Sequence, residues 1–307
     1  MIMGRFTLPN NIKLLIDRYE VHFDNLEYVF VANRCYSCPP DRFFTDRRII
    51  LREIPGTSSL IATFCDQECY SNKSTIIIRD KHTKYSLSYL LTILNCRLLY
   101  WYFLLVASKS DQNLFPRLSL TNTRQLPIRR INFTTPESER KKLVNNLTTQ
   151  YKTAQSDQVL TQVEECLPKD KDDNFITDQE KSDVIHDFLA FLAEQMIKMN
   201  KEKQAEIKNF FSWLKDVHGI DKDVLKPKTY LNKFYKLESG DLFKHLEKNK
   251  IKPNPTDYSR IKNAFEESVN KLRPLIQRME TTDCLIDQVV YKLYGLTEEE
   301  IKIVEGK

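Results

Sequence analysis

The chain has 307 residues, of which 41% are apolar and 11% aromatic, enough for packed cores, so a wholly disordered protein is excluded. Only 6 Gly stand against 12 Pro, and 29% of the residues are charged. This composition argues against an all-β architecture and favours a helix-rich protein with two domains.

The net charge of +5 is unevenly divided along the chain. Residues 1–142 hold 21 Lys and Arg against 13 Asp and Glu, whereas residues 143–307 hold 26 against 29. A basic front half and a mildly acidic back half are expected when one domain approaches a polyanion and the other does not. Ordinary charge for solubility is the alternative interpretation.

Neither a secretory signal nor a membrane span is predicted. Residues 1–10 have no sustained apolar run. Residues 87–106 are apolar, but Asn95 and Arg97 interrupt them, and an Arg at the centre of a span costs about 2.5–3.5 kcal/mol on insertion scales. We therefore expect a buried helix there, no membrane partner, and a cytoplasmic protein whose seven cysteines are reduced thiols.

Four cysteines have a spacing near that of a structural zinc site. Cys35 and Cys38 are separated by two residues, Cys65 and Cys69 by three, and 26 residues lie between the two pairs. Against zinc, no knuckle glycine follows either pair, and the second pair lies in a segment that resembles a strand leading into a turn. Free thiols are the main interpretation, and zinc on these four residues is the alternative.

Short β-branched or aromatic runs predict strands in the first domain, at residues 28–31, 49–51, 60–64 and 75–78. Residues 86–108 have apolar side chains at helical spacing, which predicts one long core helix packed on the sheet. After it, two proline-limited segments are expected to return as edge strands, at residues 114–118 and 123–128. The prediction is a mixed β-sheet with a buried core helix.

From Thr135 onward the pattern is helical. Thr135-Pro136-Glu137 has the order of a helix start, with a capping hydroxyl, a proline and an acid. Gly219 is expected to end a long amphipathic helix, and Thr297 with Glu300 predicts a capping box. The fold class is therefore α+β. We expect a domain at 1–133 with the sheet, followed by an all-α domain at 134–307, composed of a connecting helix at 134–167 and a bundle at 178–307.

The helical domain shows no clear catalytic motif. Asn254-Pro255-Thr256-Asp257-Tyr258 comes nearest to the tetrad with which amino methyltransferases hold a flipped base, but it lacks the second proline and is better explained as a helix start. Glu206 and Glu300 are each followed two residues later by lysine, as in some nuclease sites. In such Lys/Glu-rich helices, however, solvated ion pairs are the usual arrangement.

Basic and polar side chains of the first domain are the candidates for contact with nucleic acid. Arg holds guanine with two hydrogen bonds and Asn does the same to adenine, while Lys, Ser and Thr hold phosphates. These candidates flank the predicted strands or follow the core helix, where a rigid sheet would position them. A solvated rim is the alternative for any one of them. The candidates are Arg42, Arg47, Arg48, Arg52, Asn72, Lys73, Ser74, Lys109, Arg117 and Arg124.

The motifs resemble a known family in their order. Residues 47–130, with Arg48-Ile49-Ile50-Leu51-Arg52, Leu94-Asn95-Cys96 and Phe115-Pro116-Arg117, are similar to the target-recognition domain of TaqI-like adenine-specific DNA methyltransferases and fused restriction-modification enzymes. Residues 183–189 and 287–296 are similar to the helical tail of the same enzymes. The cofactor and base-flipping motifs of that family are not found in this sequence.

The resemblance implies a sequence-specific module for double-stranded DNA in a restriction-modification system, with no catalytic residue and no cofactor of its own. The first domain would read the major groove, and the helical domain would dock a methyltransferase or restriction subunit. Two alternatives stay open. One is a divergent metal-dependent endonuclease that uses Glu206 or Glu300, and the other is a non-catalytic fragment that docks a partner chain without binding DNA.

Overall fold

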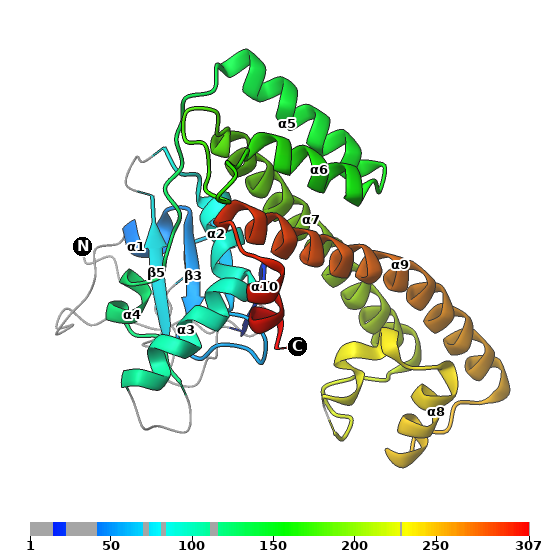
Figure 1. Cartoon of the computed structure of the whole chain (residues 1–307). Helices are drawn as coiled ribbons and strands as arrows, with labels where there is room; N and C mark the ends of the chain where they lie inside the picture. Colours follow the sequence, from blue (N-terminus) through cyan, green and yellow to red (C-terminus); the bar gives the residue numbers. More distant parts are fainter. Residues whose placement is uncertain are drawn as a thin grey trace, which may run out of the picture. The chain divides into compact units, whose positions relative to one another are not determined.

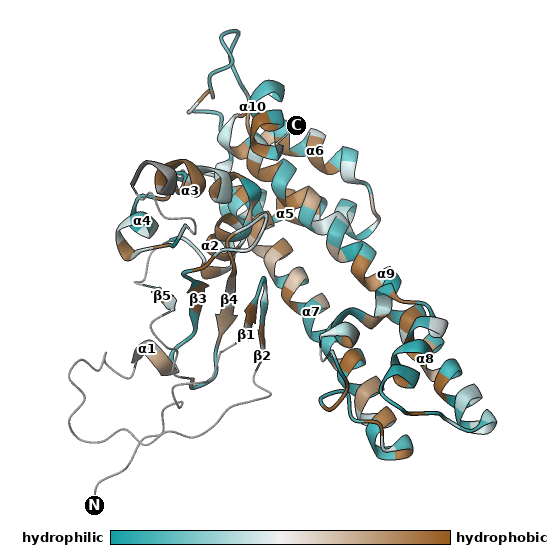
Figure 2. Cartoon of the chain, turned by 90° about the horizontal axis from the view of Figure 1, so that it is seen from below, coloured by the Kyte–Doolittle hydropathy of each residue, from teal (hydrophilic) through white to brown (hydrophobic). Residues whose placement is uncertain are grey.

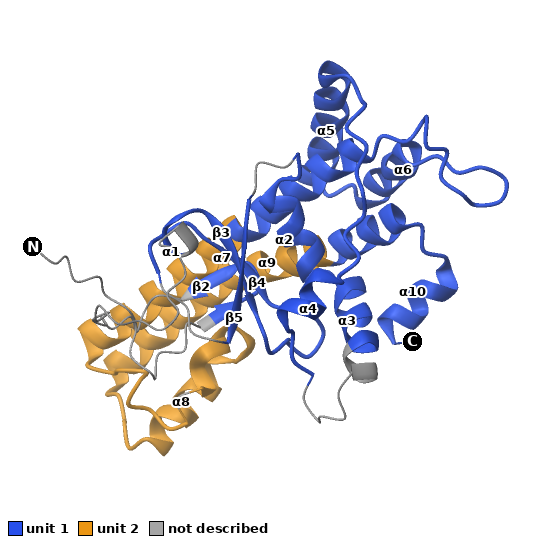
Figure 3. Cartoon of the chain, turned by 90° about the vertical axis from the view of Figure 1, so that its left-hand side faces the viewer, with its two compact units in different colours: residues 1–197, 284–307 blue, residues 198–283 orange. Residues whose placement is uncertain are grey.

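The computed structural model describes residues 15–22, 42–69, 74–80, 84–110, 116–227 and 229–306 (Figure 1). The chain divides into two compact units, coloured in Figure 3: unit 1 is residues 1–197 with 284–307, and unit 2 is residues 198–283. The boundary predicted from the sequence, between residues 133 and 134, lies inside unit 1. As a boundary between sequence domains it stays a prediction.

A three-stranded sheet with the order β4-β3-β5 forms the platform of unit 1. Its strands are β3 (Arg48–Arg52), β4 (Ala62–Cys65) and β5 (Thr75–Arg79), and β1 (Leu15–Asp17) pairs with β2 (Glu20–His22) in a separate hairpin next to β4 (Figure 2). The α+β class is confirmed. Among the described strands every pairing is antiparallel, not mixed as expected, because short connections suffice for antiparallel neighbours whereas parallel ones need a long crossover.

The predicted core helix is two helices, α2 (Leu87–Asn95) and α3 (Arg97–Ser110). Cys96 lies between them with an extended backbone, φ −73° and ψ 157°. Within the described residues, no single helix is long and apolar enough to cross a membrane, and α2 with residues 97–106 meets that test only as a pair bent by 65°.

The segment after α3 is also different from the prediction. The expected edge strand at residues 123–128 is wrong, because the short helix α4 (Leu120–Arg124) occupies its first residues. Ser119 caps α4 by accepting a hydrogen bond from the Asn122 amide at 3.0 Å, and this local bond favours a helical turn over a strand. The described part of the other predicted strand, residues 116–118, belongs to no helix or strand.

The helix α2 lies between the sheet and the long helix α7 (Ser182–His218). On one side it packs against β3 and β4, and the side chain of Asn95 bonds the amide and the carbonyl of Ala62 at 2.9 and 3.0 Å. On its other side, the hydroxyl of Thr92 donates to the carbonyl of Leu189 on α7 at 2.9 Å. The core of unit 1 therefore continues from the sheet through α2 into the helical region.

The predicted connecting helix is a hairpin of two helices, α5 (Glu137–Lys152) and α6 (Ser156–Cys166). Ala154, with φ 58°, turns the chain between them. At the start of α5, Thr135 is not the capping residue that we predicted, because its hydroxyl is bonded to Asp183 on α7 at 2.6 Å. The predicted ends of other helices are confirmed: Gly219 follows α7 with φ 65°, and Thr297 and Glu300 form the capping box of α10 (Glu298–Glu305).

Unit 2 is built on the second half of α7 and the first part of α9 (Pro255–Tyr294), with a 3₁₀ segment, η1 (Tyr230–Lys236), and α8 (Ser239–Lys248) between them. Asn254 starts α9 as predicted, since its side-chain oxygen accepts from the Asp257 amide at 2.8 Å. The core of this unit is rich in aromatic residues. Its fully buried members include Leu214, Phe234, Leu242, Leu246, Ile261 and Leu272.

Candidate nucleic-acid interface

Three segments of the chain meet at the end of β3. The amide of Glu53 donates to the carbonyl of Ser74 at 3.0 Å, and the carbonyl of Glu53 accepts from the amide of Leu118 at 2.8 Å. These backbone bonds bring Arg52, Ser74 and Arg117 to one end of the central strand β3, although up to 65 positions separate them in the sequence. Arg124 follows Arg117 by seven positions, in the last turn of α4. We call Arg52, Ser74, Arg117 and Arg124 the rim.

The rim differs in exposure from residue to residue. Arg117 and Arg124 are exposed, and neither has an ion pair within the part of the chain that the structure describes. Ser74 is exposed at the start of β5. Arg52 is half-buried, and its guanidinium lies 3.4 Å from the carbonyl of Ile16 on β1. Solvent thus reaches the side chains of Ser74, Arg117 and Arg124 more freely than that of Arg52.

Arg47 lies at the other end of β3. A five-residue strand is about 17 Å long, so the distance between Arg47 and the rim is several times the rise per base pair of a DNA duplex. Arg47 is exposed, and its guanidinium carbon lies 4.6 Å from the ring centroid of Phe64, which restrains its position. Nearby, Arg79 pairs with Asp46 at 2.5 Å. The predicted arginines therefore form two groups and not one.

Arg48 is the candidate whose position does not fit contact with DNA. Its side chain is 0% exposed. The guanidinium donates to the carbonyls of Asp46 at 2.8 Å, Gln67 at 3.2 Å and Cys69 at 2.8 Å. It is enclosed because residues 65–69 fold over the start of β3. We therefore leave Arg48 out of the interface and assign it to the structure of the sheet.

The remaining candidates cannot be placed by their side chains. Asn72 and Lys73 lie outside the described residues, and so do Cys35 and Cys38. Arg42 begins α1 (Arg42–Thr45) and Lys109 lies in the last turn of α3, but only their backbones are described. Their contact with nucleic acid, like that of the rim, stays a prediction.

The second cysteine pair lies beside Arg48. The sulfur atoms of Cys65 and Cys69 are 3.2 Å apart, both thiols are buried, and the guanidinium of Arg48 lies 3.0 Å from the Cys69 sulfur. The hydrogen bond from Cys69, against the opposing effect of burial and with help from the charge of Arg48, lowers the pKa of Cys65 to about 7. The pKa of Cys69 is raised, first by this same bond and then by burial. Among the described residues, no group of three or more His, Cys, Asp or Glu could hold a metal ion.

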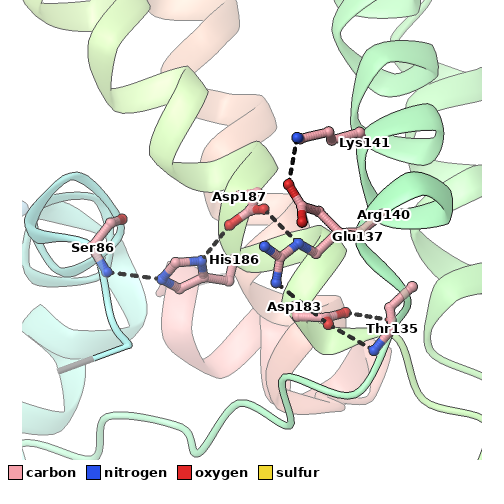
Figure 4. Close-up of polar contacts among 8 residues, drawn as sticks. All are labelled: Ser86, Thr135, Glu137, Arg140, Lys141, Asp183, His186 and Asp187. Atoms are coloured by element: carbon pink, nitrogen blue, oxygen red, sulfur yellow. Dashed lines mark hydrogen bonds and ion pairs between the residues drawn. The ribbon is translucent and has the colours of Figure 1, made fainter.

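A polar cluster joins the start of α2 to α7 and α5 (Figure 4). We call it the buried joint, and it consists of Ser86, Thr135, Arg140, Asp183, His186 and Asp187. The amide of Ser86 donates to Nε2 of His186 at 3.0 Å, so Nδ1 carries the proton that is shared with Asp187 at 2.8 Å. Arg140 of α5 pairs with Asp187 at 3.1 Å. Only the backbone of Ser86 takes part, because its hydroxyl caps α2 by accepting from the Tyr89 amide at 3.0 Å. The cluster therefore holds helices together and is not a nucleophile with its base.

Asp183 and the aromatic residues around His186 complete the cluster. The carboxylate of Asp183, which is 0% exposed, accepts from the amide and hydroxyl of Thr135 at 3.0 and 2.6 Å. The ring of His186 lies 4.6 Å from that of Tyr89 and 5.1 Å from that of Phe133, measured between centroids. The sequence alone does not predict this joint. Its only local signal is Asp183 in the first turn of α7, which the helix dipole alone explains.

The two carboxylates considered for nuclease chemistry have structural partners. Glu206 accepts from the hydroxyl of Ser268 at 2.7 Å and lies 3.8 Å from the ammonium of Lys271. Glu300 bonds the amide of Thr297 at 2.8 Å in the capping box. They belong to different units, and each is used by its own helix contacts.

Comparison with protein families now adds to this geometry. Residues 14–128 match the family model of the TaqI-like C-terminal specificity domain. The chain carries a TaqI-like specificity domain. The resemblance seen in residues 47–130 is thereby confirmed, and it extends over all five described strands, α2, α3 and α4. Specificity domains of this kind recognise DNA sequence in restriction-modification systems.

The helical region has a separate match. Residues 177–290 match a domain of unknown function, DUF8810, which covers α7, the whole of unit 2 and most of α9. Neither the curated proteins nor the solved structures gave a significant match to the chain. The buried joint thus spans both family matches, since Ser86 lies within the first and Asp183 and His186 lie within the second.

Proposed function

We propose that the chain is a non-catalytic recognition module that binds one short sequence of double-stranded DNA within a restriction-modification system. The match of residues 14–128 to the specificity domain carries this proposal. Exposed arginines at the rim support it, because Arg is the side chain best suited to bidentate contact with guanine in the major groove. Arg47 and the side chains of Arg42, Asn72, Lys73 and Lys109 are the further proposed contacts.

We also propose a role for the helical region in assembly. Methyl transfer and cleavage would be supplied by a methyltransferase or restriction subunit, which the helical domain at 134–307 would dock in the cytoplasm. The buried joint between α2, α5 and α7 supports this division, because a partner bound to the helices would be fixed firmly to the specificity domain. Co-purification of the chain with such a subunit would test this part.

The proposed DNA recognition can be tested with a pool of random duplexes. The purified chain should retain one short sequence after repeated selection at moderate salt. Arg117→Ala should lower affinity for that sequence by about 1–3 kcal/mol, or roughly 5- to 150-fold, and relax the preference at one position. Arg52→Ala should do the same at another position. The control is Arg260→Ala, because Arg260 is an exposed residue of α9 in unit 2. This variant should bind the selected sequence as tightly as the unchanged chain does.

Two outcomes would contradict the proposal. If the selected pool shows no preferred sequence at moderate salt, the chain is not a sequence-recognition module. If plasmid incubated with the chain and Mg²⁺ is cut, and Glu206→Gln or Glu300→Gln abolishes cutting, the endonuclease alternative is correct. Retention of a partner subunit without any DNA binding would favour the docking fragment.

A further inference from the structure

The acidic back half of the chain contains a basic unit. Unit 2, residues 198–283, holds 19 Lys and Arg against 13 Asp and Glu. The remaining helical residues, 143–197 and 284–307, hold 7 against 16. The mildly acidic net charge of residues 143–307 is therefore the sum of two opposite net charges. Unit 2 alone has a net charge of +6.

Three lysines of unit 2 are brought together by one asparagine. The side chain of Asn249 accepts from the amide of Lys226 at 2.8 Å and donates to the Lys226 carbonyl at 3.0 Å. Lys248 and Lys250 are the immediate neighbours of Asn249 in the chain, and the amide of Lys250 bonds the carbonyl of Glu247 at 2.8 Å. Lys226, Lys248 and Lys250 are all exposed. We call these three residues the lysine tip.

The lysine tip is not neutralised within its own unit. None of its three ammonium groups has an ion pair in the described part of the chain. Two other lysines of the same region do, since Lys244 lies 3.7 Å from Asp241 and Lys252 lies 3.6 Å from Glu247. Acids are thus present nearby but face other lysines. Three adjacent, unpaired cations repel one another, and a bound polyanion would relieve that repulsion.

A buried histidine and a tyrosine lie next to the residues of the lysine tip. His245 is buried, and the ring of Tyr230 stacks on it with 4.4 Å between centroids. Burial, with a smaller effect from the charge of Lys248, lowers the pKa of His245 and so favours its neutral form. The amide of Tyr230 is bonded to the Pro227 carbonyl at 3.1 Å, close to Lys226. The positive charge of this surface therefore comes from lysines alone.

We propose that the lysine tip binds the phosphate backbone of duplex DNA without reading its sequence. Lysine is a compact point charge that suits phosphate contact, whereas base reading favours the planar forks of Arg, Asn and Gln, which the tip does not present. The choice of DNA over another polyanion rests on the proposed function of the specificity domain. The tip would raise the affinity for every duplex, whereas the rim would select the sequence.

A charge-reversal variant of the full chain tests the tip. Lys226→Glu, Lys248→Glu and Lys250→Glu are combined, and the control combines Lys201→Glu, Lys208→Glu and Lys262→Glu, exposed lysines on α7 and α9. Both variants change the net charge equally. Each is titrated with a fluorescent duplex that lacks the selected sequence, and the affinity is measured by anisotropy at several NaCl concentrations. Equal circular dichroism and thermal midpoints establish that both variants are folded.

The tip variant should bind at least tenfold more weakly at low salt. Its slope of log K against log salt should be shallower by about 2–3, since each lost phosphate contact removes about 0.9. The control should change the slope by less than one. Equal slopes in the two variants would overturn the proposal, and so would weaker binding to a single strand but not to the duplex. If the triple variant fails to fold, Lys→Gln variants at the same positions replace it.

The outcomes separate this proposal from recognition by the rim. A tip variant that binds weakly but still selects the same sequence supports both. An unchanged tip variant in a chain that selects one sequence overturns the tip alone. A chain that selects no sequence, but whose duplex affinity depends on the tip, overturns the proposed recognition and leaves the tip. Competition of duplex by polyglutamate at equal charge would indicate an acidic protein as the partner, against our proposal.

Discussion

Arg47 and Arg48 are neighbours with opposite environments. Arg47 is exposed beside Phe64, whereas Arg48 is enclosed and donates to three backbone carbonyls. Arg48 is the first residue of β3, whereas Arg47 lies in the bend before the strand, so the two side chains have different surroundings. Sequence alone does not show which face is covered, because the cover is supplied by residues 65–69. This is why all of the arginines around β3 were predicted to be equivalent.

The role assigned to Arg48 predicts a loss of stability. Arg48→Met keeps much of the side-chain volume but leaves buried carbonyls without donors, and each such group costs about 1–3 kcal/mol. The free energy of unfolding, measured with urea, should fall by about 3 kcal/mol. Arg47→Met is the matched control and should change it by less than about 0.5 kcal/mol. A stable Arg48→Met protein with weakened DNA binding would return Arg48 to the interface.

The low pKa of Cys65 makes stability depend on pH. The pKa is lowered from 9.0 to about 7 in the folded chain, mainly by the bond from Cys69. Between pH 7 and 9 the unfolded chain therefore binds more protons, and stability should rise with pH, by on the order of 1–2 kcal/mol. Urea midpoints at several pH values measure this. Cys65→Ser should remove the rise, and an unchanged rise in that variant would assign it to another group.

At the scale of elements, boundaries set by local interactions were predicted and boundaries set by distant contacts were not. Gly219 and the Thr297 capping box act within one turn, and both are confirmed. The break at Cys96 depends on remote partners: Asn95 bonds Ala62, and the amide of Arg97 donates to Asp287 at 2.9 Å. The apolar spacing continues through the break, so the sequence pattern predicts one helix.

The start of α5, at Thr135, is also determined by a distant contact. Its position before Pro136 and Glu137 predicts a cap from local sequence, but its hydroxyl bonds Asp183, 48 positions later. A buried carboxylate needs donors wherever they can be found, and this requirement outweighs a helix cap that water can replace. The joint around His186 could not be predicted for the same reason, because its partners come from three distant segments.

Two glycines allow backbone strain to be separated from close contact. Gly219 and Gly295 both end long helices with positive φ, 65° and 73°. A Cβ at Gly295 would lie 2.9 Å from the Phe175 ring, whereas one at Gly219 has no neighbour within 4 Å. Gly219→Ala should therefore cost about 1 kcal/mol from backbone strain alone. Gly295→Ala should cost about 2–3 kcal/mol, because overpacking adds to that strain.

Thermal unfolding of the two glycine variants measures this difference. The midpoint should fall further for Gly295→Ala than for Gly219→Ala. Adding Phe175→Leu to Gly295→Ala should restore part of the loss, since it removes the ring that the new Cβ meets. Equal midpoints for the two single variants would show that the Phe175 ring moves away without cost.

At the scale of the molecule, the two units have separate hydrophobic cores. Phe234 is 0% exposed in the core of unit 2, where its ring lies 4.7 Å from that of Phe210. The sheet core is built on β3 and α2 in unit 1. The sequence predicted a helical bundle after residue 178, but not that α7 and α9 each contribute to both units. Periodicity reports a buried face and does not say which core buries it.

Separate cores predict separate local stability. Phe234→Ala should destabilise unit 2 by about 3–5 kcal/mol because it leaves a cavity in an aromatic core. Hydrogen exchange followed by mass spectrometry should then be faster in residues 198–283 and unchanged in β3 and α2. Phe243→Ala is the control, since Phe243 is only partly buried. Faster exchange throughout the sheet would mean that the chain unfolds as one cooperative body.

The backbone hydrogen bonds of Glu53, at the end of β3, affect how recognition can change during evolution. Its two bonds, to Ser74 and Leu118, use only backbone atoms. Substitutions at positions 52, 74 and 117 can therefore vary the chemical groups displayed while the main-chain frame persists. A combinatorial library at these positions, with position 48 held constant, is the natural starting point for retargeting the protein to new sequences.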